Sequence, residues 1–351
     1  MNLEQPTLEQ APEAIAKDKS LLGGYAYQVI TRQAKRIFQL RSQVLADSDL
    51  EPLHQMRIGT RQMRSALILF ADVIELDASK KEKKKKNTQK KLSIAKPAKS
   101  FKKLTQALGN VRDLDVMGQW FKQAIADHTA DASRFSKKEK KAIHHLLKTL
   151  KKRRKKQFSK LKKTLKSSTY KTLIGQFKQW EKQPAFSAKA QQSASRNAAE
   201  RLVAPITELL QHPGWQVATQ KRGEQLTPID NITLAQLNQA LAQDGARLHD
   251  LRKQIKRVRY QAEFFRGLYG ITYVAQIREF RTLQKTLGQL QDQIVISQFL
   301  AAEIGPDWAQ TLPTLEANFQ NSRLALWQQW QLYQRKYLKL SDALPSSQRT
   351  A

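Results

Sequence analysis

The stretch that decides the fold of this chain is Leu53-His54-Gln55-Met56-Arg57-Ile58-Gly59-Thr60-Arg61-Gln62-Met63-Arg64. It recurs in altered form as Leu248-His249-Asp250-Leu251-Arg252-Lys253-Gln254-Ile255-Lys256-Arg257-Val258-Arg259. In each copy a basic residue follows the histidine at +3, +7 and +10, and apolar residues lie at −1, +2 and +9. Two copies of one charged helix predict a two-fold repeated structure with a polyanion between its halves.

The spacing places the basic residues beside the buried face of each helix. Apolar residues form a seam with steps of three and four, and the basic residues follow one position further round. Because one residue turns an α-helix by about 100°, the basic stripe borders the seam and does not lie opposite it. Such a stripe should line a cleft and suits a run of phosphates. The predicted seams are Leu53, Met56, Thr60, Met63, Leu67 and Phe70, and Leu248, Leu251, Ile255, Val258, Ala262 and Phe265.

A second motif follows each stripe. Residues 108–116 match residues 287–295, and both contain Leu-Gly. Lys99 and Lys102 precede the first glycine at the same two spacings at which Arg278 and Arg281 precede the second. The interval from the motif histidine to this glycine is longer in the first half than in the second. The excess is explained if the lysine-rich segment 79–97 is a mobile insertion that belongs to the first half.

Apolar periodicity predicts helices throughout the chain and no convincing strand. Ser136 with Glu139 forms a predicted capping box, Pro52 lies near the start of its helix, and Gly109 is predicted to end one. Residues 1–17 are expected to be a flexible tail, and residues 183–195 a polar linker. The predicted helices cover approximately residues 25–45, 52–73, 98–108, 110–126, 136–180, 196–211, 234–243, 291–304 and 312–340, besides the second stripe.

The composition indicates a folded protein with a polyanionic partner. The 351 residues are 40% hydrophobic and carry a net charge of +32. Residues 1–180 hold 41 basic and 16 acidic residues, so most of the excess charge lies in the first half. The absence of cysteine excludes disulfides and thiolate metal sites. No apolar run is long enough to span a bilayer and none resembles a signal peptide, so we expect a cytoplasmic protein without membrane insertion.

These motifs resemble the CHAD family, the conserved-histidine α-helical domain. The resemblance rests on His54-x-x-Arg57-x-x-x-Arg61-x-x-Arg64, on Leu108-Gly109 with Arg112-Asp113-x-Asp115, and on their counterparts in the second half. It covers residues 18–345, with halves at about 18–182 and 195–345. It implies an all-α fold of two pseudo-symmetric helical bundle halves around a basic central channel. It also implies binding of inorganic polyphosphate and association with polyphosphate granules.

The predicted polyphosphate-binding residues come from the stripes and from the cations before each glycine. The second half departs from the family pattern at two positions, where Gln291 and Ile294 replace the expected Arg and second Asp. The cations of this half are therefore expected to be oriented less firmly. The triphosphate-tunnel motif of some relatives is absent, so its hydrolase activity is not carried over. The predicted binding residues are His54, Arg57, Arg61, Arg64, Lys99, Lys102, His249, Arg252, Lys253, Lys256, Arg257, Arg259, Arg278 and Arg281.

The same residues admit other roles. The stripes could be solvated faces, but their duplication beside a seam favours anion binding. A metal site at His54 or His249 is disfavoured by the surrounding cations, so no metal or cofactor is expected. Asp113, Asp115 and Asp292 could bind Mg²⁺ or act in catalysis; helix capping or pairing with stripe arginines is the preferred interpretation. The lysines of segments 80–91 and 137–166 are expected to supply diffuse attraction.

The leading functional hypothesis is therefore a non-catalytic polyphosphate-binding protein. A nucleic-acid-binding protein is the first alternative, although no known motif and no aromatic interleaving support it. An enzyme of phosphate chemistry is the second, and the scarcity of clustered carboxylates argues against it. Both histidines are expected to gain protons beside phosphate, so binding should tighten as pH falls from about 8 to 6. Oligomeric state and chain-length preference are left open.

Overall fold

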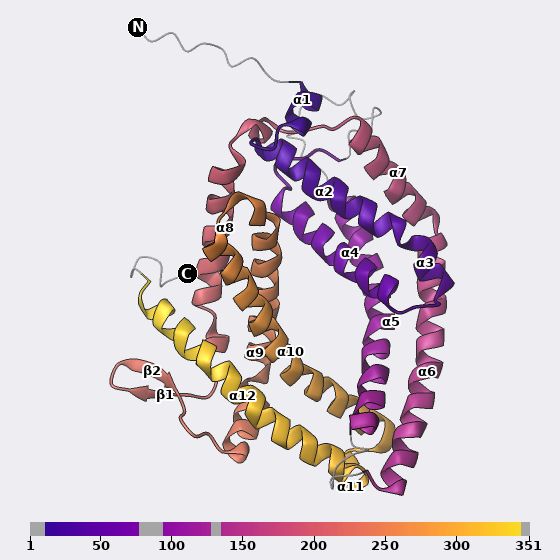
Figure 1. Ribbon diagram of the computed structural model, residues 1–351, viewed down its shortest axis with the longest axis vertical. Coiled ribbons are helices and arrows are strands. Elements are labelled where there is room, and N and C mark those ends of the chain that lie inside the picture. Colours follow the sequence, from indigo (N-terminus) through magenta and orange to yellow (C-terminus); the bar gives the residue numbers. More distant parts are fainter. Residues whose placement is uncertain (1–10, 77–93, 128–134, 345–351) are drawn as a thin grey trace. The chain divides into compact units, whose positions relative to one another are not determined.

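The computed structural model describes residues 11–76, 94–127 and 135–344. Apart from one hairpin, the regular elements of this part are helices, which confirms the predicted all-α class (Figure 1). The predicted insertion lies almost wholly outside the described residues. The α-helices are α1 Pro12–Lys17, α2 Leu22–Gln39, α3 Arg41–Ala46, α4 Glu51–Leu69, α5 Ala95–Asp127, α6 Lys137–Lys166, α7 Ser168–Lys182, α8 Ala194–Leu210, α9 Leu234–Phe264, α10 Ile271–Ile304, α11 Trp308–Thr311 and α12 Pro313–Asp342.

The chain divides into two compact units whose boundaries run through three helices. Unit 1 comprises residues 1–115 and 153–201, and unit 2 comprises residues 116–152 and 202–351. Helices α5, α6 and α8 therefore each contribute residues to both units. The predicted linker, residues 183–195, belongs to unit 1, where Leu22 N–H donates to Gln192 O and Ala194 N–H donates to Ser20 O.

Unit 1 is built around the pairing of α2 with α4, which lie side by side (Figure 1). Ile30, Ala34 and Ile37 of α2 are buried, as the apolar spacing predicted. Phe101 of α5 packs edge-on against Phe177 of α7, with ring centroids 5.5 Å apart. The predicted N-terminal tail includes a short helix, α1, because burial of Ile15 and Ala16 holds that segment. Residues 1–10 lie outside the described part.

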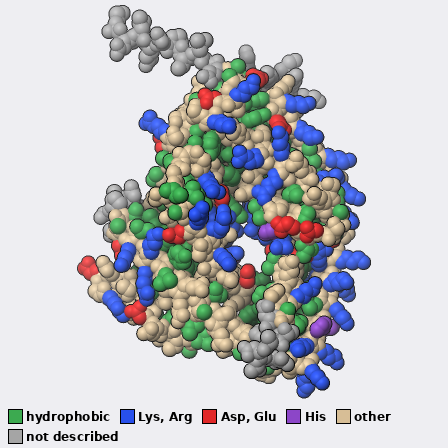
Figure 2. Space-filling model, in the orientation of Figure 1, with side chains coloured by type: hydrophobic (Ala, Val, Ile, Leu, Met, Phe, Trp, Pro, Cys, Tyr) green, Lys and Arg blue, Asp and Glu red, His purple; other side chains and the backbone are tan. Residues whose placement is uncertain are grey.

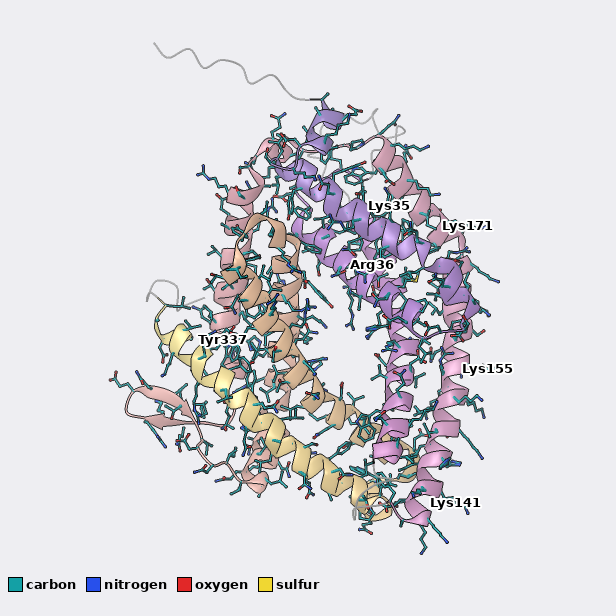
Figure 3. All side chains as sticks on the ribbon, in the orientation of Figure 1. Lys35, Arg36, Lys141, Lys155, Lys171 and Tyr337 are labelled. Atoms are coloured by element: carbon teal, nitrogen blue, oxygen red, sulfur yellow. The ribbon has the colours of Figure 1, made fainter. Side chains whose placement is uncertain are left out.

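Unit 2 is built around the pairing of α9 with α10. Its core includes Trp215, which stacks between Trp330 and Tyr337 at centroid distances of 5.0 and 4.4 Å. Tyr337 lies on α12 (Figure 3). The neighbouring Gln334 amide donates to the backbone carbonyls of Trp215 and Val217 and is fully buried. This amide attaches the loop after α8 to α12.

The expectation of no strand was wrong for residues 219–228. Strands β1 Thr219–Arg222 and β2 Gln225–Pro228 form an antiparallel hairpin in register from Thr219–Pro228 to Arg222–Gln225. Gly223 makes the turn with φ of +62°. The strands are polar and mostly exposed or half-buried, so they lack the apolar alternation that would have signalled them.

Several predicted helix boundaries also differ from the structure. Segment 136–180 is two helices, because the Ser167 hydroxyl accepts from Tyr170 N–H and caps a new start. Segments 234–243 and 248–259 are one helix, α9, which begins at a capping box of Thr233 and Gln236. The predicted capping box at the start of α6 is confirmed: Ser136 N–H donates to Glu139, and Glu139 N–H donates to Ser136 Oγ.

Candidate anion-binding site

In unit 1 the basic stripe borders the buried seam of α4, as the spacing predicted. All six seam residues are buried, and the polar member, Thr60, donates its hydroxyl hydrogen to the Arg57 carbonyl at 3.0 Å. The stripe residues on the same helix are half-buried, namely His54, Arg57, Arg61 and Arg64. Long cationic side chains at this border keep their stems against apolar neighbours while their charged ends reach outward.

Arg57 lies directly over Gly109 of α5. Its Nε and Nη2 atoms are 3.4 and 3.5 Å from the point where a Cβ atom on Gly109 would stand. Arg57 Nη2 also donates to Asp113 Oδ1, one helical turn further along α5, at 2.9 Å. The prediction that Gly109 ends a helix was wrong: α5 runs through it, and the glycine serves the close approach of the arginine. The predicted pairing of Asp113 with a stripe arginine is confirmed.

In unit 2 the corresponding residues make the same local contact. The seam of α9, from Leu248 to Phe265, is buried at all six predicted positions. Arg252 lies over Gly288 of α10, with Nη2 and Nε 3.3 and 3.4 Å from the Cβ position. Helix α10 continues through Gly288, just as α5 continues through Gly109. An arginine three residues after the histidine therefore packs over a mid-helix glycine in each unit.

The two histidines of the motif have different neighbours. His54 is close to Arg112 of α5, and burial together with this guanidinium holds the pKa of His54 below its ordinary value. Within the described residues, His54 Nδ1 and Arg112 Nε are buried without a hydrogen-bond partner. His249 Nδ1 instead lies 3.1 Å from Gln291 Oε1 of α10. Arg112 and Gln291 occupy the same position of the repeated motif.

Arg259, the last residue of the second stripe, is held inside an ion-pair cluster. Its side chain is only 10% exposed; its Nη1 donates to Glu263 Oε2 at 2.6 Å and its Nε to Gln284 Oε1 at 3.0 Å. Arg281 reaches the other oxygen of Glu263 at 3.1 Å. Glu263 thus ties the stripe of α9 to one of the two cations that precede Gly288.

The other predicted cations are exposed, apart from Lys256, which is half-buried. Lys253 pairs with Asp250 on its own helix, and Arg257 lies 3.8 Å from Glu208 of α8. These pairs are solvated and contribute little to stability. The exposed group consists of Lys99, Lys102, Lys253, Arg257, Arg278 and Arg281.

Asp115 does not contact a stripe arginine. Its carboxylate receives a hydrogen bond from Arg154 Nε at 2.5 Å, and Arg154 also donates to both oxygens of Asp47 at 2.6 and 2.7 Å. Burial raises the pKa of the Asp115 carboxyl despite this cation. Arg154, which interrupts the apolar seam of α6, therefore joins α6 to α5 and to the end of α3 inside unit 1.

The outer face of α6 carries a dense row of exposed lysines. Figure 2 shows the blue side chains along the edge where α6 and α7 run, and Figure 3 shows Lys141 and Lys155 pointing away from the ribbon. Apart from buried Glu139, α6 contains no acidic residue. These lysines are exposed, and their part in diffuse attraction stays a prediction.

Sequence reasoning missed three residues that lie against the stripes. Arg112, Gln291 and Glu263 were not among the predicted site residues, yet each contacts or faces a stripe side chain. The signal for the first two was the repeat alignment itself. Glu263 carries no such signal, because the alignment gives it no acidic counterpart in the first half.

Comparison with known proteins identifies the fold. The CHAD domain family matches residues 28–301. This chain belongs to the CHAD family. The crystal structure of the CHAD domain from the plant Ricinus communis matches with 20% identity and a TM-score of 0.56, over 97% of this chain and 98% of that one. PptA from Streptomyces chartreusis matches with 15% identity and a TM-score of 0.57, over 89% and 100%. No curated protein matches the chain.

The family and the fold therefore agree with the predicted resemblance, whereas the pseudo-symmetry of the halves stays a prediction. No helix in the described residues is long and apolar enough to cross a bilayer. The CHAD match leaves out residues beyond 301, where α12 completes the core of unit 2.

Proposed function

We propose that this CHAD protein binds inorganic polyphosphate without catalysing a reaction. The observation that carries the proposal is the arginine packed over a glycine in each unit, Arg57 over Gly109 and Arg252 over Gly288. Each arginine belongs to a half-buried basic row beside an apolar seam. A guanidinium held in one position offers several N–H donors in a plane, which suits the oxygens of a phosphate chain.

The residues proposed to bind polyphosphate are of two kinds. The half-buried stripe residues would bind successive phosphates. Arginine would make bidentate hydrogen bonds, and lysine would act as a point charge. The exposed cations before each glycine would extend the row. Arg259 would act as a positioning residue, because its guanidinium is already engaged by Glu263. The basic central channel and association with polyphosphate granules in the cytoplasm are parts of the same proposal, and family membership supports them.

Two matched variants test the proposal. One replaces Arg57, Arg61, Arg252 and Lys256 with Gln, and the other replaces the exposed α6 lysines Lys141, Lys148, Lys152 and Lys155 with Gln. Both variants remove four positive charges, so their comparison separates the contribution of a shaped site to affinity from the contribution of overall charge. The stripe variant should lose at least about 100-fold in polyphosphate affinity, and the α6 variant less than about tenfold, since charged hydrogen bonds contribute more than exposed charges.

The measurement is a binding titration with polyphosphate, with circular dichroism and thermal unfolding as folding controls. Equal losses in the two variants would show that net charge, and not the stripe, governs binding. Full affinity in a folded stripe variant would overturn the proposal. Release of orthophosphate from polyphosphate by the pure protein would overturn its non-catalytic part.

A further inference from the structure

We infer that the two motif histidines use different proton chemistry: His54 binds phosphate as a neutral hydrogen-bond donor, whereas His249 binds it by taking up a proton. The residues that set this difference are Arg112 and Gln291, which act as positioning residues. The inference rests on the proposed polyphosphate binding and refines it. It also refines the expectation that both histidines gain protons.

Arg112 and Gln291 occupy one position in a shared frame. Each stands three positions after the glycine that the stripe arginine covers, Gly109 in unit 1 and Gly288 in unit 2. The arginine contact itself is closely matched. The Nε and Nη2 atoms lie 3.4 and 3.5 Å from the glycine Cβ position in unit 1, and 3.4 and 3.3 Å from it in unit 2. The change from arginine to glutamine therefore falls beside an arginine–glycine contact that is the same in both units.

The two neighbours differ in the hydrogen bonds that they can make. A guanidinium carries only donors and always holds its charge, so Arg112 cannot accept a hydrogen bond from His54 Nδ1. His54 Nδ1 is buried, and within the described residues no acceptor faces it. A proton at Nδ1 would be a buried donor without a partner beside a cation, which is costly. His54 therefore keeps its single proton on Nε2.

The charges around His54 favour the same state. Arg57 and Arg61 on its own helix and Arg112 on α5 oppose protonation, and Glu51 is the acidic residue that favours it. Burial and these cations keep the pKa of His54 below its ordinary value of about 6.5. A phosphate oxygen can still accept a hydrogen bond from Nε2–H. That contact requires no proton uptake.

His249 is in the opposite situation. Gln291 presents its amide oxygen to Nδ1 at 3.1 Å, so Nδ1 carries a hydrogen and donates it. In the neutral ring Nε2 then holds a lone pair, which repels a phosphate oxygen. Binding at Nε2 requires a proton there, and the Gln291 oxygen already satisfies the Nδ1–H of the resulting imidazolium. Asp250 on α9 is a charged group that interacts with His249, and it also interacts with Lys253 and with His212.

Proton uptake on binding tests the inference directly. Calorimetric titration with long-chain polyphosphate near pH 6.5, in buffers of different ionisation enthalpy, counts the protons taken up. The wild type should take up a measurable fraction of one proton. His249→Gln should abolish the uptake and His54→Gln should preserve it. Two exchange variants extend the test: Gln291→Arg should take up no proton, and Arg112→Gln should take up about twice as much as the wild type.

Nitrogen-15 NMR of the six histidines gives a second readout that needs no ligand. In the free protein at neutral pH, His54 should be the Nε2–H tautomer and His249 the Nδ1–H tautomer, with assignments from the two single variants. Uptake that disappears in His54→Gln and persists in His249→Gln, or the opposite tautomers, would overturn the inference. Binding without proton uptake would also overturn it while leaving the proposed function intact. If polyphosphate does not bind at all, the proposed function fails, and the tautomers alone decide the proton assignment.

Discussion

The guanidinium of Arg57 lies 3.4 Å from the position that a Cβ atom on Gly109 would occupy. A methyl group there makes an ordinary contact, whereas a longer side chain would displace the guanidinium. We therefore expect Gly109→Leu to weaken polyphosphate binding by about tenfold or more, equivalent to about 1.4 kcal/mol. Gly118 lies on the same helix, and a Cβ there would meet no atom within 4 Å. Gly118→Leu is the matched control and should bind normally.

Gly109→Ala separates the two roles of this glycine. Alanine in a helix interior is more favourable than glycine by about 1 kcal/mol, so this variant should be slightly more stable and bind polyphosphate nearly as the wild type does. Urea unfolding and a binding titration measure the two effects. A stable Gly109→Leu variant with undiminished affinity would show that the position of Arg57 does not matter.

The buried carboxylate of Asp115 depends on Arg154. Arg154→Met would leave Asp115, whose side chain is 1% exposed, without its cation, and breaking such a pair costs about 3–5 kcal/mol of unfolding free energy. Burial raises the pKa of Asp115 in the folded protein, so protonation favours the native state. The deficit should therefore shrink as pH falls from about 7 to 4.

Chemical denaturation at several pH values measures this deficit. Lys152→Met, an exposed site on the same helix, should change stability by less than about 0.5 kcal/mol. If Arg154→Met and Lys152→Met behave alike, Arg154 does not hold α5 and α6 together.

Glu139 joins the start of α6 to α12 within unit 2. One carboxylate oxygen accepts from Ser136 N–H at 2.8 Å and the other from Thr314 N–H at 3.0 Å. Burial alone would raise the pKa of Glu139, but these hydrogen bonds keep it below 4.5 in the folded protein. The stabilisation is therefore present above about pH 4.5 and is lost as pH falls through the lower native pKa.

Replacing Glu139 with Gln removes one of the two acceptor oxygens and should destabilise the protein at neutral pH. The stability difference between the variant and the wild type should shrink as pH falls below about 4.5. Thermal unfolding between pH 3 and 7 compares them. A difference that stays constant with pH would contradict the ionised role of Glu139.

The salt dependence of binding should report the number of stripe contacts. Polyanion binding releases counterions, so the logarithm of the affinity should fall linearly with the logarithm of salt concentration. The variant with Gln in place of Arg57, Arg61, Arg252 and Lys256 should have a slope that is smaller by roughly three to four. The guide is the duplex-DNA value of about −0.9 per neutralised phosphate. The α6 variant should reduce the slope by less than about one. A larger change from α6 would locate the contacts on its outer face.

The sequence predicted the parts of the site that depend on helix period. The seam of α4 and the half-buried stripe from His54 to Arg64 follow from steps of three and four, and the repeat added the same pattern in α9. Gly109 was misread because glycine signals a helix end only in the left-handed region. Among the described glycines that region holds Gly223 and Gly305.

Other parts of the site could not be derived from local pattern. The ion pairs of Arg154 with Asp47 and Asp115 span 107 and 39 residues, and only the packing of α6 brings them together. The hairpin at 219–228 was missed because its strands bury little apolar surface. The sequence shows that Gln291 stands where the first half has Arg112. The inferred position of the proton on His249 depends on the contact between His249 Nδ1 and Gln291 Oε1, which only the structure gives.

We propose that the stripes recognise polyphosphate in particular and not polyanions in general. Labelled polyphosphate bound to the wild-type protein, at one fixed salt concentration near 0.15 M, is competed with unlabelled polyphosphate, duplex DNA and RNA at equal phosphate concentration. Unlabelled polyphosphate should displace the label at concentrations at least about tenfold lower than either nucleic acid. Displacement by DNA or RNA at equal or lower phosphate concentration would contradict the claim and favour a nucleic-acid-binding protein.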